Sequence, residues 1–205
     1  MRTTVAAAAV AAALAVPNFA AAQAAASPVA GNFSLVSDYR FRGLTQTFEE
    51  PAIQGGFDYA HSSGFYIGNW NSSISDTFYA GSPLEMDFYA GYKPTFGDFT
   101  LDLGVLYYYY PGSNLAGVGR IDNTELYAGV AWKWLSLKYF HAVSDFFGAP
   151  DTKNSNYIDL TASYTFAGGW GVSGHVGQQK VKNISAADYT DYKIGVTKDF
   201  GGWVF

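Results

Sequence analysis

The fold is decided by a stretch near the N-terminus, Ser37-Asp38-Tyr39-Arg40-Phe41-Arg42-Gly43, and by the segment that follows it, Pro51-Ala52-Ile53-Gln54-Gly55-Gly56-Phe57-Asp58-Tyr59. Together they predict two strands joined by a loop. Side chains of a strand alternate between its two faces. In the first strand, one face therefore carries Tyr39 and Phe41, and the other is charged. A soluble sheet buries the apolar face, whereas a membrane barrel turns it to lipid and keeps the polar face inside.

The first 22 residues have the order of features typical of a secretory signal peptide. A short basic start, 1–4, is followed by an apolar run over 5–16 and by the small residues Ala20-Ala21-Ala22. The run is too short to cross a bilayer as a helix, which needs about 20 residues. A buried Ala-rich helix is the alternative. We therefore predict a signal peptide over 1–22, a flexible leader over 23–30 and a mature domain over 31–205.

Composition favours a membrane barrel for the mature chain, whose length fits one domain. Aromatic residues make up 18% of the sequence and charged residues only 14%, against an average charged content of about 25%. A soluble domain this poor in charge would cover its surface badly. The net charge of −5, with scattered Lys and Arg, argues against a nucleic-acid partner. The absence of cysteine argues against a disulfide scaffold.

Alternating segments recur after the leader, and none has a helical period. The predicted strands are 32–42, 53–61, 65–74, 84–93, 98–110, 123–133, 136–144, 155–166, 170–180 and 189–200. Their mean length is about ten residues, as a tilted transmembrane strand requires, whereas soluble strands average about 5–6. Short links alternate with long ones, as in outer-membrane barrels with short periplasmic turns and longer external loops. The alternative is a soluble all-β sandwich, in which strands and turns also recur.

The end of the sequence predicts the start of a further strand. Gly201-Gly202 favours a turn, which leaves Trp203-Val204-Phe205 as a stub beyond ten strands. Single-chain bacterial barrels have even strand numbers. We therefore expect a sequence truncated by about one hairpin and an antiparallel transmembrane β-barrel of about twelve strands in the complete protein. A ten-stranded barrel with a short tail is the alternative.

Opposed faces also identify candidate pore-lining residues. In 84–93, for example, Met86 and Phe88 oppose Glu85 and Asp87. The strand 65–74 is ambiguous, because aromatic side chains occur on both of its faces. The residues expected to line the lumen are Asp38, Arg40, Arg42, Asp58, Glu85, Asp87, Lys93, Asp102, Glu125, Lys133, Lys138, Asp159, His175, Asp191 and Lys193. Acidic groups outnumber basic ones in this set, so a pore would mildly favour cations.

The number of strands does not decide whether the lumen is open or plugged. Eight strands give an interior just filled by side chains, and porin-sized channels need about 16. A twelve-stranded barrel lies between, so both a solute-permeable pore and a packed, plugged lumen are possible. The Tyr run 107–110 predicts an aromatic girdle at the outer interface, with an external sugar-stacking or adhesive patch as the alternative.

An outer-membrane enzyme is the less favoured alternative function. Of the three histidines, His61 lies in a tight turn, His141 near an interface, and His175 points into the lumen. Ser173 is about 7 Å from His175 by strand rise, too far for a direct hydrogen bond. The sequence has no G-x-S-x-G, H-E-x-x-H or P-loop motif. No catalytic residue, cofactor or metal site is predicted.

Several segments resemble the TorF family of proteobacterial outer-membrane proteins. The resemblance rests on 37–43, on Gln46-Thr47, on 51–59, on Gly64-Phe65-Tyr66-Ile67-Gly68 and on Leu84-Glu85-Met86-Asp87. It extends over essentially the whole mature chain, with its most specific part in 37–70. The resemblance implies an outer-membrane barrel with pore activity, and it carries over no catalytic or substrate-binding residue.

The sequence therefore predicts an exported protein of the Gram-negative outer membrane that lets small hydrophilic solutes or ions diffuse passively. The alternative is a non-conducting structural or adhesive barrel that acts through its external loops. The expected partners are outer-membrane lipid, small hydrophilic solutes or ions and, during biogenesis, periplasmic chaperones and the barrel-assembly machinery.

Overall fold

The fold is an antiparallel sheet, seen in a computed structural model that describes residues 28–205. The predicted signal peptide lies outside the described residues, as does most of the predicted leader. The principal strands are β1 (Val29–Val36), β4 (Ala52–Ala60), β5 (Phe65–Ser73), β6 (Leu84–Tyr92), β8 (Phe99–Tyr109), β9 (Asn123–Trp132), β10 (Leu135–Ala142), β11 (Asn156–Thr165), β12 (Trp170–Lys180) and β13 (Tyr189–Lys198). Short elements are β2 (Arg40–Phe41), β3 (Leu44–Thr45), β7 (Thr95–Phe96) and the 3₁₀ turns η1 (Phe146–Gly148) and η2 (Ser185–Ala187).

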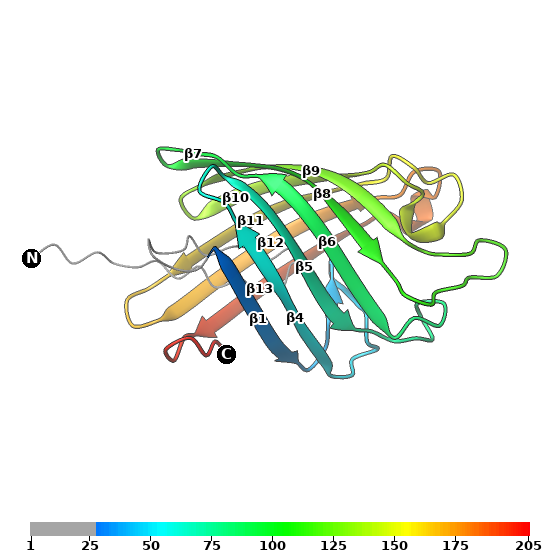
Figure 1. The fold of residues 1–205 in the computed structure, drawn as a ribbon, viewed down its shortest axis with the longest axis horizontal. Helices are drawn as coiled ribbons and strands as arrows, with labels where there is room; N and C mark the ends of the chain where they lie inside the picture. Colours follow the sequence, from blue (N-terminus) through cyan, green and yellow to red (C-terminus); the bar gives the residue numbers. More distant parts are fainter. Residues whose placement is uncertain (1–27) are drawn as a thin grey trace, which may run out of the picture.

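Each principal strand pairs with its neighbour in the sequence, in the order β1-β4-β5-β6-β8-β9-β10-β11-β12-β13. This confirms the predicted all-β antiparallel class. The sheet is strongly curled, with β1, β4, β5 and β6 in front of β10–β13 in Figure 1. Strands β1 and β13 are its two edges, so the sheet is not closed. Within residues 28–205, no helix combines the length and apolar character needed to cross a bilayer.

The links separate the two ends of the curled sheet. The short turns, such as 61–64 and 133–134, lie at one end, which we call the turn end; the long links, such as 74–83 and 110–122, lie at the other, the loop end. The stub after Gly201-Gly202 turns back onto the end of β13, where Phe205 and Lys198 exchange backbone hydrogen bonds of 3.0 and 2.8 Å. Most predicted strand boundaries agree with the structure within a few residues.

The first strand is the exception. Strand β1 begins at Val29, so the last two residues of the predicted leader belong to the sheet. It ends at Val36, so the prediction of one strand over 32–42 is wrong. The reason lies in the turn that follows: Asp38 accepts hydrogen bonds from the hydroxyls of Thr45 and Thr47, at 2.5 and 3.2 Å. Such side-chain bonds compete with a continued strand ladder.

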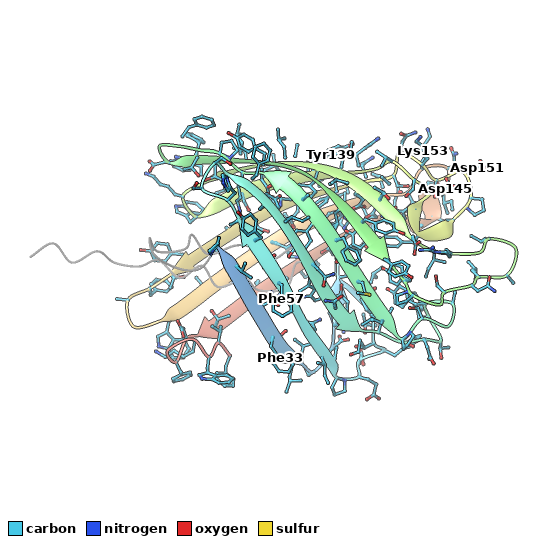
Figure 2. All side chains as sticks on the ribbon, in the orientation of Figure 1. Phe33, Phe57, Tyr139, Asp145, Asp151 and Lys153 are labelled. Atoms are coloured by element: carbon cyan, nitrogen blue, oxygen red, sulfur yellow. The ribbon has the colours of Figure 1, made fainter. Side chains whose placement is uncertain are left out.

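The two faces of the sheet have opposite character. Phe57 on the outer face of β4 is 69% exposed, whereas its neighbour Asp58 on the inner face is 6% exposed. Phe33 on β1 is also 69% exposed, and Figure 2 shows both rings on the outside. The ambiguous strand β5 is settled in the same way, since Tyr66 and Trp70 point inward. Large apolar side chains therefore cover the outside, and the charges are gathered inside.

The inside is occupied by residues 37–51, which we call the inserted segment. Its centre is a tight hairpin of β2 and β3, in which Arg42 and Gly43 have φ values of 46° and 81°. Positive φ at both central residues is the mark of a type I′ turn. The segment contacts strands from both halves of the sheet, β5 and β6 through Tyr39 and β9 and β12 through Arg42. The sheet therefore curls around it.

Candidate functional site

Arg42 is the centre of the polar interior. Its guanidinium forms a two-pronged ion pair with Glu125 of β9, with N–O distances of 2.6 and 3.1 Å, and donates to Gln179 of β12 at 2.9 Å. Both charged side chains are almost fully buried, at 3% and 0% exposure. Burial alone would lower the pKa of Arg42, but the carboxylate of Glu125 raises that pKa well above its ordinary value. Such a geometry is the strong form of an Arg–carboxylate pair.

Aromatic rings hold the same guanidinium from the sides. Its carbon lies 4.4 Å from the ring centre of Tyr157, 4.7 Å from that of Phe41 and 5.0 Å from that of Phe140. Cation–π contacts of this kind are strongest where water is excluded. The hairpin tip therefore anchors the inserted segment to β9, β10, β11 and β12.

A second anchor joins the inserted segment to the opposite wall. The hydroxyl of Tyr39 donates to Glu85 at 2.7 Å, and Tyr110 donates to the other oxygen of Glu85 at 2.8 Å. The ring of Tyr39 packs edge-to-face on Trp70, with centroids 5.3 Å apart. The predicted lipid-facing position of Tyr39 is therefore wrong: the residue is 4% exposed and lies inside.

Next to this anchor lies an unusual carboxylate. Asp87 of β6 is fully buried, and neither of its oxygens has a hydrogen-bond partner among the described residues. It shares the loop-end half of the interior with Glu85 and Glu125. Of these three carboxylates, Glu125 is the one that pairs directly with Arg42.

Nearer the turn end, Asp102 organises a third cluster. Its two oxygens accept from Tyr66 at 2.5 Å and from Lys138 at 2.7 Å, and Tyr66 also bonds to the hydroxyl of Tyr127. Lys138 lies 4.7 Å from the centre of the Tyr127 ring. Burial lowers the pKa of Lys93, which follows β6.

His175 forms the fourth cluster. Its ring nitrogens lie 2.6 Å from Asp159 and 3.1 Å from Asp191, so a carboxylate occupies each side of the imidazole. The hairpin tip touches the same group, because a Cβ added to Gly43 would meet Cβ of Asp191 at 2.6 Å. With both nitrogens engaged, the ring is placed for charge pairing and not for activating Ser173. The described residues contain no group of three or more His, Asp or Glu side chains arranged to hold a metal ion.

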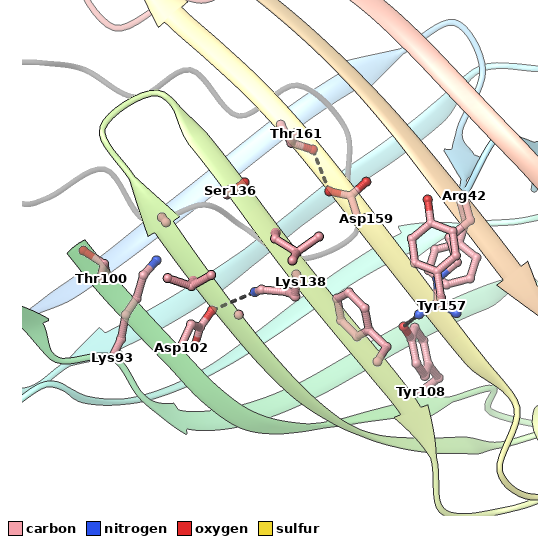
Figure 3. Close-up of a pocket in the computed structure, with 16 residues that line it drawn as sticks. Arg42, Lys93, Thr100, Asp102, Tyr108, Ser136, Lys138, Tyr157, Asp159 and Thr161 are labelled. Carbon is pink, nitrogen blue, oxygen red and sulfur yellow. Dashed lines mark hydrogen bonds and ion pairs between the residues drawn. The ribbon is translucent and has the colours of Figure 1, made fainter. Parts of the chain in front are cut away.

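A cavity of about 80 Å³ lies on the inner face, between the inserted segment and the turn end. Arg42 and Tyr157 line the side next to the inserted segment, and Lys93 and Thr100 line the opposite side (Figure 3). Phe41 also lines the cavity. Lys138 and Asp102 lie in the wall between them. The interior is therefore filled at the loop end and hollow toward the turn end.

The chain belongs to the Gcw_chp family. The match covers residues 20–205, and the family is described as a bacterial protein of unknown function. No curated protein and no solved structure matches the chain. Family membership therefore shows a bacterial protein of a family without a described function, and the resemblance to TorF porins stays a prediction.

Most residues predicted to line the lumen lie inside this curled Gcw_chp sheet, on its inner face or, for Arg42, at the tip of the inserted segment. They are Arg42, Asp58, Glu85, Asp87, Lys93, Asp102, Glu125, Lys138, Asp159, His175, Asp191 and Lys193. Asp38 lies in the inserted segment, pairing with Arg40 at 2.6 Å. The Arg40 side chain is 50% exposed. Lys133 lies in the turn after β9, where it pairs with the exposed Asp98 at 3.4 Å.

Sequence reasoning missed the tyrosines that organise these carboxylates. Tyr66, Tyr89 and Tyr157 are buried, and their hydroxyls donate to Asp102, Asp58 and Asp191. Alternation could have placed Tyr89 and Tyr157 inside, since each shares the parity of an acidic neighbour, whereas the strand of Tyr66 contains no acidic residue. The tyrosine run agrees with the predicted sidedness: Tyr108 and Tyr110 are buried inside, and Tyr107 and Tyr109 are on the outer face.

Proposed function

We propose that the protein is an exported outer-membrane β-barrel that lets small hydrophilic solutes or ions diffuse passively through its interior. The observation that supports this most is the reversed sheet, with charges inside and apolar rings outside. Ile194 is 88% exposed on the outer face, whereas Glu125, Asp159 and Glu85 are at most 2% exposed inside. An apolar outer face is favourable in contact with lipid, whereas its exposure to water is unfavourable.

Closure of the sheet belongs to the proposal. An open strand edge leaves backbone groups unpaired, which lipid does not tolerate. The proposal therefore requires the edges β1 and β13 to be joined in the membrane, directly or through further strands. The inserted segment supports a closed form, because it already contacts β5 on one side and β13 on the other.

Passage would be controlled at the loop end. The inserted segment fills that end and is held by Arg42 and Tyr39, so a solute would pass beside it or after it moves. The carboxylates of Asp87 and Glu85 line this level and would favour cations.

Conductance of the full-length protein in planar bilayers tests the proposal. We expect discrete current steps that depend on salt, with mild cation preference. Asp87→Asn and Asp102→Asn should reduce this preference, whereas Asp98→Asn, which changes an exposed turn residue, should leave it unchanged. Absence of discrete steps in verified, folded samples would overturn the porin assignment. Unchanged selectivity in both interior variants would remove those residues from the pathway.

The filled loop end favours a second candidate, a non-conducting structural or adhesive barrel that acts through its loops. This candidate predicts a protein that inserts into membranes and resists unfolding there but carries no current. Binding of cells or surfaces that is lost when the link 110–122 is replaced by a short turn would support it.

A further inference from the structure

One wall of the cavity on the inner face is built by neighbouring strands β10 and β11. Their successive inner-face pairs all line it, and these pairs are Ser136 with Thr161, Lys138 with Asp159, and Phe140 with Tyr157. The wall therefore changes along its length from hydroxyl groups through charges to aromatic rings. Pockets with an apolar wall and a few placed polar groups are the usual form of small-molecule sites.

The charged groups that line the cavity already have partners. Arg42 pairs with Glu125 at 2.6 Å, and Lys138 pairs with Asp102 at 2.7 Å. Asp102 also acts electrostatically on Lys93. A charged ligand would meet no unpaired opposite charge here, and removing its charge from water would be unfavourable. The lining therefore favours a neutral ligand.

These charged groups still have unused hydrogen-bonding capacity. A carboxylate and an ammonium can each make more than two hydrogen bonds. Lys138 donates to Asp102 and to no other described residue. Asp159, the remaining carboxylate of the lining, accepts from Thr161 at 2.6 Å and lies 2.6 Å from the ring of His175. An alcohol group can use the remaining capacity without disturbing the ion pairs, because it is uncharged and both donates and accepts.

Ser136 adds a hydroxyl that is free to bond a ligand. It lines the cavity, and its side chain makes no hydrogen bond to another described residue. Figure 3 shows Ser136 on the strand that carries Lys138, beside the strand that carries Thr161. The hydroxyls of Ser136 and Thr161 are therefore neighbours across the two strands, as alcohol groups on adjacent carbons of a ligand would require.

The aromatic side of the cavity favours carbon over water. Phe41, Phe140 and Tyr157 present ring surface to the cavity. Water gains no hydrogen bonds from an apolar wall, whereas the C–H groups of a ligand are removed from water when they contact it. The cavity of about 80 Å³ has room for about three waters at ~30 Å³ each. A ligand must therefore be small.

We propose that this cavity binds a small neutral polyol of about the size of glycerol, with its hydroxyls on Ser136 and Thr161 and its carbon chain against Phe140. The site is formed within the curled sheet, so binding does not require the interior to conduct. Failure of the porin assignment would leave this proposal standing.

Chemical-shift titration by NMR of the full-length protein in detergent micelles tests the proposal with glycerol, propanol and glycerate. We expect saturable shifts with glycerol. Propanol lacks most of the hydroxyls and glycerate brings a charge, so each should bind at least about ten-fold more weakly. Propanol or glycerate binding as tightly as glycerol would overturn the proposal, and so would the absence of saturable shifts with glycerol.

Variants locate the site. Ser136→Ala should weaken glycerol binding about five-fold, the typical effect of one lost neutral hydrogen bond. Ser173→Ala is the matched control, since Ser173 lies on β12 and does not line the cavity. Phe140→Leu should weaken the binding of glycerol and propanol alike. Near-ultraviolet circular dichroism checks that each variant is folded. Folded Ser136→Ala that binds glycerol as the unaltered protein does would overturn the proposal.

Discussion

The inserted segment and strand β6 have the same sequence pattern and opposite structures. Both alternate large apolar and charged residues, as in Tyr39-Arg40-Phe41-Arg42 and Glu85-Met86-Asp87-Phe88. Strand β6 pairs along its length with β5 and β8. The inserted segment leaves the sheet and crosses its interior. Alternation therefore shows that one face of a segment is polar. It does not show whether the segment is a strand of the curled sheet or lies in its interior.

What separates the two is the chemistry of the turn. Arg42 and Gly43 adopt positive φ, and Asp38 draws in the hydroxyls of Thr45 and Thr47. Strand β6 has no such interruption between Leu84 and Tyr92. The inserted segment also depends on a partner that is remote in the sequence, because Arg42 pairs with Glu125, 83 residues later.

The largest effect is expected at the ion pair. Arg42→Ala leaves Glu125 buried without its partner, and breaking a buried pair from one side typically costs about 3–5 kcal/mol. Urea unfolding in lipid vesicles measures this loss. Arg40→Ala is the control, because that side chain is half exposed and its pairs are worth about 0–1 kcal/mol. Similar losses for the two variants would show that the segment is not anchored by Arg42.

A smaller effect is expected at the hairpin tip. Gly43→Ala forces a Cβ onto Asp191 as well as a positive φ, whereas Gly112→Ala meets nothing within 4 Å at a similar φ. The φ term, about 1–2 kcal/mol, is common to both. Overpacking should add about 1–3 kcal/mol for Gly43 alone. Equal unfolding free energies for the two variants would contradict the close contact between the tip and β13.

One substitution in strand β6 is expected to stabilise the protein. Asp87→Asn removes a buried charge whose oxygens have no described partner, and keeps the shape of the side chain. We expect a gain of about 1 kcal/mol at neutral pH, because an unsatisfied charged group costs more to bury than an amide. Urea unfolding at pH 7 measures it. A loss of stability would indicate that Asp87 has a bound partner in the native protein.

The smallest effect is expected in the loop before β13. The backbone N–H of Val181 donates to Asp188 at 2.8 Å and Lys180 donates at 3.1 Å, and together they lower the pKa of Asp188. A carboxyl with a lowered folded pKa contributes stability above its unfolded value of about 3.9, and that contribution is lost as pH falls through the folded pKa. Asp188→Asn should therefore reduce the difference between the unfolding free energies measured at pH 6 and at pH 3. An unchanged difference would show that the loop contacts do not persist.

The sequence was sufficient to predict the strands of the curled sheet and their polar inner face. It was not sufficient to predict the inserted segment that fills the interior. The pleat fixes a period of two, so the buried acids of β6, β8 and β9 could be placed from alternation alone. The position of Tyr39 could not, because it depends on a turn held by Asp38 and on contacts with Glu85 and Trp70, which are remote in sequence. Lys133 was misplaced for a similar reason: one residue past a strand end, in a positive-φ turn, parity no longer applies.

We infer that the inserted segment, held by Arg42, closes the loop end of the interior. Single-channel conductance of the unaltered protein, of Arg42→Ala and of Arg40→Ala in planar bilayers tests it most directly. We expect larger unitary current or longer openings for Arg42→Ala, with Arg40→Ala equal to the unaltered protein. Identical conductance and open times in all three, with channels present, would contradict it.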